Sequence, residues 1–212
     1  MKKTSTTSKK SWWSKLLVLF CLWACMPGAA LGAGGDAPRA VIERTSSAVL
    51  AVLADKSSSA DEKRRKIQDI VYVEVDFETL SRLVLAQNWK RLSPEQQKEF
   101  VEQFRQHLAL TYGRNVDNYH NEKVSIVGDR EEKGGDWTVQ SKILRGGADD
   151  ISLDYRLRQK DGQWRIIDFI IEGVSLVSNF RSQFQEIIAN GGPEHLLELL
   201  RQKNATGEPL KS

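Results

Sequence analysis

Cysteine is almost absent from this chain of 212 residues: there are two, Cys21 and Cys25, and both lie near the N-terminus. A domain built from the later residues therefore contains no disulfide and must be stable through its hydrophobic core alone. Histidine is also scarce. The three histidines, His107, His120 and His195, lie in no metal-ligand spacing. We therefore expect no metal site and no cofactor.

Long apolar runs are missing except for LLVLFCLWAC (16–25). This run follows the charged MKKTSTTSKK and precedes Ala30-Leu31-Gly32, which places small residues at the −3 and −1 positions of a cleavage site. It is too short for a comfortable transmembrane span. We predict a cleaved export signal over residues 1–32, with cleavage near Gly32/Ala33. Lipidation of Cys25 is an alternative, although Trp23 is bulky for a lipoprotein box.

A strong charge of one sign is also missing. The chain has 31 basic and 28 acidic side chains. The predicted export signal contains no acid and five lysines: Lys2, Lys3, Lys9, Lys10 and Lys15. The remaining chain therefore carries 26 basic and 28 acidic side chains, a formal charge of −2. Because this balance lacks the basic excess typical of nucleic-acid binding, we expect no nucleic-acid partner.

The only basic run beyond the signal is Lys63-Arg64-Arg65-Lys66, which is flanked by acids. Such a run usually forms the solvated face of a helix. A contact with anionic headgroups or with an acidic protein patch is the alternative.

The apolar periodicity divides the chain into helices, then strands, then helices. Helical spacing runs from Asp36 to about Gln87, with a break over 55–63, and Ser93-Pro94-Glu95-Gln96 begins another helix. Alternating patterns at 123–129, 137–144, 151–158 and 163–172 predict an antiparallel meander. A helix resumes at Ser175 or Ser178, stops at 190–192, and is followed by a last helix to about Lys203. We predict one α+β domain over 33–204 and a flexible tail over 205–212.

Two polar residues near the last strand suggest catalytic alternatives. Ser175 resembles a nucleophile within Gly173-Val174-Ser175, but the second glycine of the elbow motif is missing, which favours a helix cap. Strict alternation would place Asp168 on the same apolar strand face as Trp164, Ile166 and Ile170, where it could act as a base. The alternative is that Asp168 bonds a neighbouring strand or helix end. We predict no catalytic residue.

The helix after Ser93 carries an aromatic stripe: Phe100, Phe104, Leu108, Tyr112, Val116 and Tyr119. Such a stripe usually forms core. Periodicity alone does not distinguish a filled core from the wall of a cavity.

Two segments resemble one known family. WRIIDFIIEGVSLVSNFRSQFQEII (164–188) is similar to the closing strand and helix of the toluene-tolerance family of periplasmic phospholipid-binding proteins. DFETLSRLVLAQNWKRLSPEQQKEFVEQFRQHLALTYGRNVDNY (76–119) resembles the W…SPEQ…F…F…L…YG…Y pattern of the same family. The resemblance covers nearly all of the chain beyond the predicted signal, and both the order and the spacing of the motifs agree.

The resemblance implies a curved antiparallel sheet of about four strands, like that of nuclear-transport-factor-two-like proteins, packed against several α-helices. It also implies a periplasmic monomer that encloses the acyl chains of a phospholipid without catalysis. Such a protein carries lipid between an outer-membrane lipoprotein–porin complex and an inner-membrane ABC transporter with a mammalian-cell-entry-domain ring. The family includes hopanoid-associated members, so a hopanoid-linked carrier is an alternative.

We expect the acyl-chain pocket to be lined from the helices, the sheet and the strand-to-helix corner. The predicted lipid-binding residues are Leu83, Val84, Phe100, Phe104, Leu108, Tyr112, Ile143, Tyr155, Leu157, Ile170, Val174, Leu176 and Phe180. Two other classes of function remain open at this point. One is an isomerase or hydrolase that uses Asp168 with Tyr155, and the other is an envelope scaffold with a filled interior.

Overall fold

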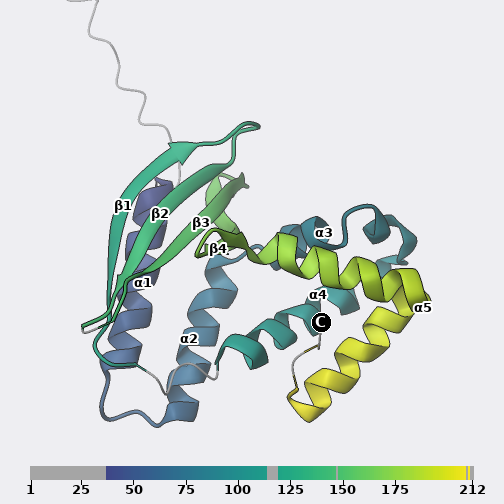
Figure 1. Cartoon of the computed structure of the whole chain (residues 1–212), viewed down its shortest axis with the longest axis horizontal. Helices are drawn as coiled ribbons and strands as arrows, with labels where there is room; N and C mark the ends of the chain where they lie inside the picture. The colour runs from purple at the N-terminus through teal and green to yellow at the C-terminus, as the bar shows by residue number, and fades with distance from the viewer. Residues whose placement is uncertain (1–36, 114–118, 147, 209, 211–212) are drawn as a thin grey trace, which may run out of the picture. The chain divides into compact units, whose positions relative to one another are not determined.

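The computed structural model describes residues 37–113, 119–146, 148–208 and 210, which belong to one compact unit. The predicted export signal and Val116 lie outside the described residues. The elements follow in the order α1 (Pro38–Ala54), α2 (Ala60–Glu74), α3 (Phe77–Leu85), the 3-10 helix η2 (Ala86–Arg91), α4 (Pro94–Tyr112), β1 (Lys123–Glu131), β2 (Trp137–Leu144), β3 (Ile151–Lys160), β4 (Gln163–Ile171), β5 (Val174–Ser175) and α5 (Leu176–Thr206) (Figure 1).

The helix starts follow from capping side chains. Ser93 accepts a hydrogen bond from the backbone N–H of Gln96, and the Gln96 side chain accepts one from the Ser93 backbone, so the predicted capping box of α4 is confirmed. Ser59 and Glu62 form an equivalent box at the start of α2. That helix begins at Ala60, within the stretch 55–63 that the sequence predicts as a break. The helix α4 ends at Tyr112, so the prediction that its stripe extends to Tyr119 is wrong: Tyr119 is not helical.

The basic run of α2 mainly joins this helix to the preceding loop. Lys63 Nζ donates to the carbonyl of Leu53 at 2.7 Å, and Lys66 Nζ donates to Ser58 at 2.8 Å and lies 3.7 Å from Asp55 Oδ2. Arg65 is exposed. The run is therefore a solvated face whose lysines also hold the α1–α2 connection.

The five strands form one antiparallel sheet in the order β1-β2-β3-β4-β5, which confirms the predicted meander and adds a two-residue fifth strand. Val139 lies opposite Tyr155, and Ile143 lies opposite Ile151, so the predicted alternation of β2 and β3 is confirmed. Figure 1 shows the strands curving along α1.

The alternation predicted for β4 is wrong because β4 contains a bulge. Asp168 lies opposite Arg156 and Ile166 opposite Leu157, so Ile167 is an extra residue in the pairing. An extra residue moves the following side chains to the other face. Ile166 therefore shares a face with Phe169 and Ile171, whereas Asp168 and Ile170 project from the opposite face.

The helices form two groups. The helix α1 packs on α2 and on β1 and β2, whereas α3, α4 and α5 pack on one another and reach the sheet at β4 (Figure 1). The second group encloses four phenylalanines: Phe100, Phe104, Phe180 and Phe184. Phe104 is fully buried, with ring centroids 5.1 Å from Phe180 and 5.3 Å from Phe184. This cluster is the filled core of the helical region.

The predicted interruption of the last helix is confirmed as a kink within α5. Gly192 has non-helical angles (φ 80°, ψ 172°), and Pro193 begins the second half. The helix ends at Thr206, two residues inside the segment predicted as tail, and Leu210 packs against the core. Among the described residues, no helix is long and apolar enough to cross a membrane.

Candidate functional site

A cavity of about 620 Å³ lies between α1, α2 and one face of the sheet. Its lining is mainly aliphatic and aromatic, with a few polar groups. The lining residues are Thr45, Ser46, Val49, Leu50, Leu53, Val71, Glu74, Val75, Tyr119, Glu122, Val124, Ile143, Arg145, Ile151, Leu153, Tyr155, Ile166, Phe169 and Ile171. A mainly apolar pocket of this size with few polar groups is typical of a small-molecule site. We call it the apolar cavity.

The helix α1 contributes one wall. Thr45, Ser46, Val49, Leu50 and Leu53 follow one another at helical spacing on the side that faces the cavity. All five are only half-buried and border the open volume of the cavity. This face is therefore apolar but incompletely packed.

The sheet contributes the opposite wall in two cross-strand rows. One row runs from Val124 through Ile143 to Ile151, and the other pairs Leu153 with Ile171. Residues directly opposite in an antiparallel pair project from the same face. The bulge in β4 keeps Ile166 on this face beside Phe169, so the cavity wall continues across four strands.

Several polar side chains interrupt the apolar lining, and Glu74 and Tyr155 are two of them. Glu74 is 9% exposed, and its Oε1 accepts a hydrogen bond from Arg44 Nη2 at 3.3 Å. Its Oε2 lies 3.6 Å from Arg165 Nη1 and has no hydrogen-bond partner among the described residues. Burial raises the pKa of Tyr155, although hydrogen bonds with Ser46 and Ser141 act in the opposite direction. Tyr155 is therefore a neutral hydrogen-bonding group at neutral pH.

The structure separates the predicted lipid-binding residues. Ile143 and Tyr155 line the apolar cavity. Seven others lie in or against the core around α3, α4 and α5: Leu83, Val84, Phe100, Phe104, Leu108, Leu176 and Phe180. The reason is that α4 packs its aromatic stripe on α5, while α1 packs on β1 and β2. Contact of these residues with lipid remains a prediction.

The other four predicted residues have different surroundings. Leu157 shares the cavity face of the sheet but is fully buried in the core, and Ile170 projects from the opposite face. Tyr112, at the end of α4, is 41% exposed. Val174 is 61% exposed and lies directly opposite the cavity residue Ile171.

Periodicity missed the α1 wall for a specific reason. The spacing of Thr45, Ser46, Val49, Leu50 and Leu53 was available in the sequence, but two of the five are hydroxyl residues. Small hydroxyl residues weaken the apolar pattern. The pocket residues were therefore predicted from the stronger aromatic stripe of α4. The signal that could have found this wall is the helical spacing of its five residues.

Asp168 and Ser175 form a helix cap. Asp168 is 1% exposed, and its carboxylate accepts hydrogen bonds from Ser175 Oγ at 2.6 Å and from the backbone N–H of Val177 at 3.0 Å. Ser175 Oγ accepts a bond from the N–H of Ser178 at 3.0 Å. A carboxylate at this end also suits the helix dipole. Because Tyr155 projects from the opposite face of the sheet, Asp168 and Tyr155 form no joint site.

The histidines are not brought together. His107 is buried between α4 and α5, with Nδ1 3.3 Å from Asn204 Oδ1, whereas His120 and His195 are exposed. Within the described ranges, no group of three or more His, Cys, Asp or Glu residues is placed to hold a metal ion.

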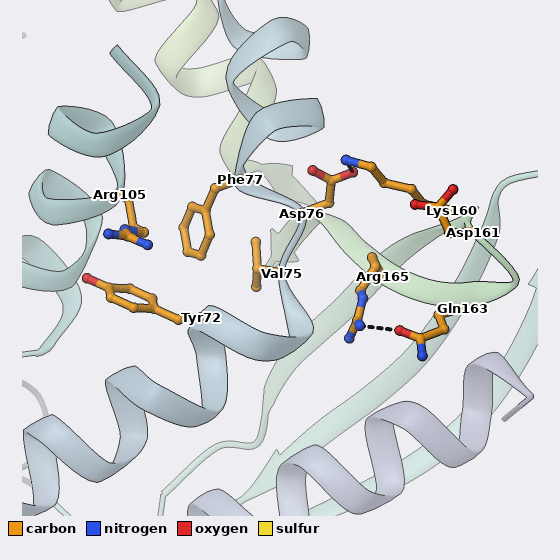
Figure 2. Close-up of a pocket in the computed structure, with 9 residues that line it drawn as sticks. All are labelled: Tyr72, Val75, Asp76, Phe77, Arg105, Lys160, Asp161, Gln163 and Arg165. Atoms are coloured by element: carbon orange, nitrogen blue, oxygen red, sulfur yellow. Dashed lines mark hydrogen bonds and ion pairs between the residues drawn. The ribbon is translucent and has the colours of Figure 1, made fainter. Parts of the chain in front are cut away.

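A second, polar pocket of about 380 Å³ lies beside Val75, which also lines the apolar cavity. Figure 2 shows Arg105 stacked over the ring of Tyr72, with Lys160 reaching Asp76. Lys160 Nζ lies 3.1 Å from Asp76 Oδ2, and Arg165 donates to the carbonyl of Val73 at 2.8 Å. These cations join α2 and the α2–α3 junction to the β3–β4 hairpin, so the polar pocket is a junction between elements.

The fold and the apolar cavity define a class of α+β proteins in which a curved antiparallel sheet and a helical hairpin enclose an apolar pocket. The model of the family described as MlaC protein matches residues 43–202. The chain therefore belongs to the MlaC family.

Curated relatives are similar to part of this chain. The toluene tolerance protein ttg2D of Pseudomonas putida is 24% identical over 119 residues, 56% of this chain and 55% of that protein. The intermembrane phospholipid transport system binding protein MlaC of Haemophilus influenzae is 25% identical over 132 residues, 60% of this chain and 62% of that protein. The chain thus spans less than two thirds of the length of these relatives.

A solved structure has the same fold. It is the phospholipid-binding protein from Ralstonia solanacearum in complex with a phospholipid, with a TM-score of 0.72 and 24% identity. The match covers 80% of this chain and 97% of that one. It confirms the predicted mixed fold with a curved antiparallel sheet.

Proposed function

We propose that this protein is a phospholipid-binding carrier that shields acyl chains in the apolar cavity and performs no catalysis on them. The observation that carries this proposal is the cavity of about 620 Å³ between the α1–α2 hairpin and the sheet. Each methylene gains roughly 0.8 kcal/mol on leaving water. A protein that provides such a cavity therefore allows a lipid to cross water without any reactive group.

The residues that we propose to contact acyl chains are the cavity lining rather than the phenylalanine cluster. Ile143 and Tyr155 belong to both the predicted set and the lining. Val49, Leu50 and Leu53 of α1 take the place of the α4 stripe, because Phe104 of that stripe already packs against Phe180 and Phe184 of α5.

The cellular setting is part of the same proposal. The family membership and the N-terminal pattern support a periplasmic protein whose residues 1–32 are a cleaved export signal, followed by one domain over 33–204. The name of the Haemophilus influenzae relative supports a place in an intermembrane phospholipid transport system. We propose as partners an inner-membrane ABC transporter with a mammalian-cell-entry-domain ring and an outer-membrane lipoprotein–porin complex.

The direct test is to express the full chain in a Gram-negative host, purify the exported protein and identify its bound lipid by solvent extraction and mass spectrometry. We expect co-purifying phospholipid, and an intact mass that corresponds to a chain beginning at Ala33. Protein that is lipid-free and also takes up no phospholipid from vesicles would overturn the proposed function. An unshortened chain would overturn the predicted cleavage alone.

A further inference from the structure

The wall that β1 and β2 give to the apolar cavity ends in two side chains of opposite charge, Glu122 and Arg145. Val124 lies opposite Ile143 in the antiparallel pairing of the two strands. Glu122 and Arg145 each lie two positions beyond this pair, so the register places them opposite each other on the same face. Both line the cavity, which agrees with this placement. We call Glu122 and Arg145 the rim pair.

The rim pair lies at a less buried end of the cavity. At the other end of the sheet wall, Tyr155 is 8% exposed and Ile166 is 2% exposed. Glu122 and Arg145 are half-buried, and Leu144, the neighbour of Arg145, is 36% exposed. The polar part of a ligand whose apolar part occupies the cavity is most stable at the end nearer to water.

The two charged groups are held by other partners and not by each other. Arg145 Nε donates to the carbonyl of Asp149 at 2.7 Å, and Arg145 Nη2 donates to the same oxygen. Glu122 Oε2 accepts a hydrogen bond from the backbone N–H of His120 at 2.7 Å. Within the part of the chain that the structure describes, Arg145 Nη1 and Glu122 Oε1 have no hydrogen-bond partner, and the rim pair forms no ion pair. Each group is thus fixed on one side and available on the other.

The chemistry of the rim pair matches a zwitterionic headgroup. A guanidinium binds a phosphate oxygen through charge-assisted hydrogen bonds. An ionised carboxylate only accepts hydrogen bonds, and an ammonium group has three to donate. An anionic headgroup without an ammonium would place its phosphate near the like charge of Glu122. The pair therefore fits a phosphate that is followed by an ammonium, as in phosphoethanolamine, better than it fits an anionic headgroup.

We propose that the rim pair binds the headgroup of phosphatidylethanolamine, with Arg145 at the phosphate and Glu122 at the ammonium. This proposal rests on the proposed function and adds the class of headgroup that the protein prefers. Arg145 is the only basic residue among the described residues that line the cavity. Its loss therefore leaves no second cation in the lining to bind the phosphate.

The test titrates three water-soluble short-chain lipids into the purified exported protein, freed of bound lipid, by isothermal titration calorimetry. Dioctanoyl phosphatidylethanolamine, dioctanoyl phosphatidylglycerol and dioctanoylglycerol have the same chains and differ only in the headgroup. The rim variants are Arg145→Gln and Glu122→Gln. The matched controls are Lys142→Gln and Glu131→Gln, which remove the same charges from exposed positions of β2 and β1 outside the cavity lining. Circular dichroism checks folding.

We expect Arg145→Gln to weaken binding of both phospholipids by about tenfold, because both lose a charge-assisted hydrogen bond to phosphate. Its affinity for dioctanoylglycerol should be unchanged. Glu122→Gln should weaken binding of the phosphatidylethanolamine alone, also by about tenfold, and so remove the preference of the wild type for this lipid over the phosphatidylglycerol. Both control variants should bind all three lipids as the wild type does.

Several results would overturn the proposal. Wild-type protein that binds the phosphatidylglycerol as tightly as the phosphatidylethanolamine would do so without any variant. Unchanged binding of the phosphatidylethanolamine by either rim variant would also do so, and so would an equal loss for all three lipids, which would make the rim pair structural. Glycerophosphoethanolamine, which has no acyl chains, should bind far more weakly, and binding as tight as that of the lipid would assign the pair to a free headgroup. Wild-type protein that binds none of the three lipids would refute the proposed function itself.

Discussion

The phenylalanine cluster of α4 and α5 and the α1 wall of the apolar cavity have the same kind of sequence pattern and opposite states of packing. Phe100, Phe104 and Phe184 have no exposed surface, and their rings contact one another. Val49 and Leu50 of α1 are half-buried and face open volume. The difference teaches that an amphipathic helix shows where apolar side chains point, whereas the partner element decides whether the space before them is filled.

The largest expected effect is a loss of stability caused by a substitution in the phenylalanine cluster. Phe104→Ala should lower the free energy of unfolding by about 3–5 kcal/mol, because the change removes a fully buried ring that three other phenylalanines surround. Urea unfolding followed by circular dichroism measures this loss. The fraction of Phe104→Ala protein that remains folded should still bind phospholipid. If stability falls by less than about 1 kcal/mol, the cluster is not tightly packed.

For the α1 wall of the apolar cavity we expect the reverse: a substitution that weakens lipid binding and leaves stability almost unchanged. Leu50→Asp should weaken phospholipid binding by about tenfold or more, because it puts a charge against the acyl chain. It should change the free energy of unfolding by only about 1 kcal/mol or less, because Leu50 is incompletely packed. The neighbouring Ala51→Asp, at an exposed position of the same helix, is the matched control and should bind normally. Equal loss of binding in both variants would contradict the cavity assignment.

The smallest expected effect concerns a polar group inside the filled region. Burial lowers the pKa of His107 below 6.5, although the hydrogen bond with Asn204 opposes this shift. The unfolded chain therefore binds a proton at higher pH than the folded chain does. His107 should contribute stability that is fully present above about pH 6.5 and declines as the pH falls below this value.

The measurement is the free energy of unfolding of wild type and His107→Gln between pH 5 and pH 8. Glutamine is neutral and can still form a hydrogen bond with Asn204. The free energy of unfolding of the variant should therefore decline less steeply below about pH 6.5 than that of the wild type. The difference in free energy of unfolding between the two proteins should become smaller as the pH falls. A decline as steep as that of the wild type would assign the acid sensitivity to other groups.

Local chemistry made most elements predictable. The capping box at Ser93, the alternating strands of the meander and the interruption at 190–192 each depend on residues within a few positions of one another, and each is confirmed. The failures arose where the outcome depends on a distant segment. The bulge opposite Arg156 and Leu157 is a property of the β3–β4 pairing, and it moved Ile170 to the face opposite the cavity.

The residues of the candidate site likewise divide into those that local sequence predicts and those that depend on a distant segment. Asp168 and Ser175 were correctly weighed toward a helix cap, because their partners are close in sequence. Ile143 and Tyr155 were found because strict alternation holds in β2 and β3. Val49, Leu50 and Leu53 were missed, because nothing in their spacing states that α1 rather than α4 covers the sheet.

The sequence by itself determined the order and type of the elements, the apolar face of each and the resemblance to one family, since these depend on short-range spacing and on motifs. Only the tertiary structure decided which apolar faces meet tightly and which leave a volume between them. Packing is a relation between side chains that are distant along the chain, and a cavity exists only where that relation leaves volume unfilled. Of these two regions, the fold packed the one around α4 and α5 tightly and left an unfilled volume beside α1.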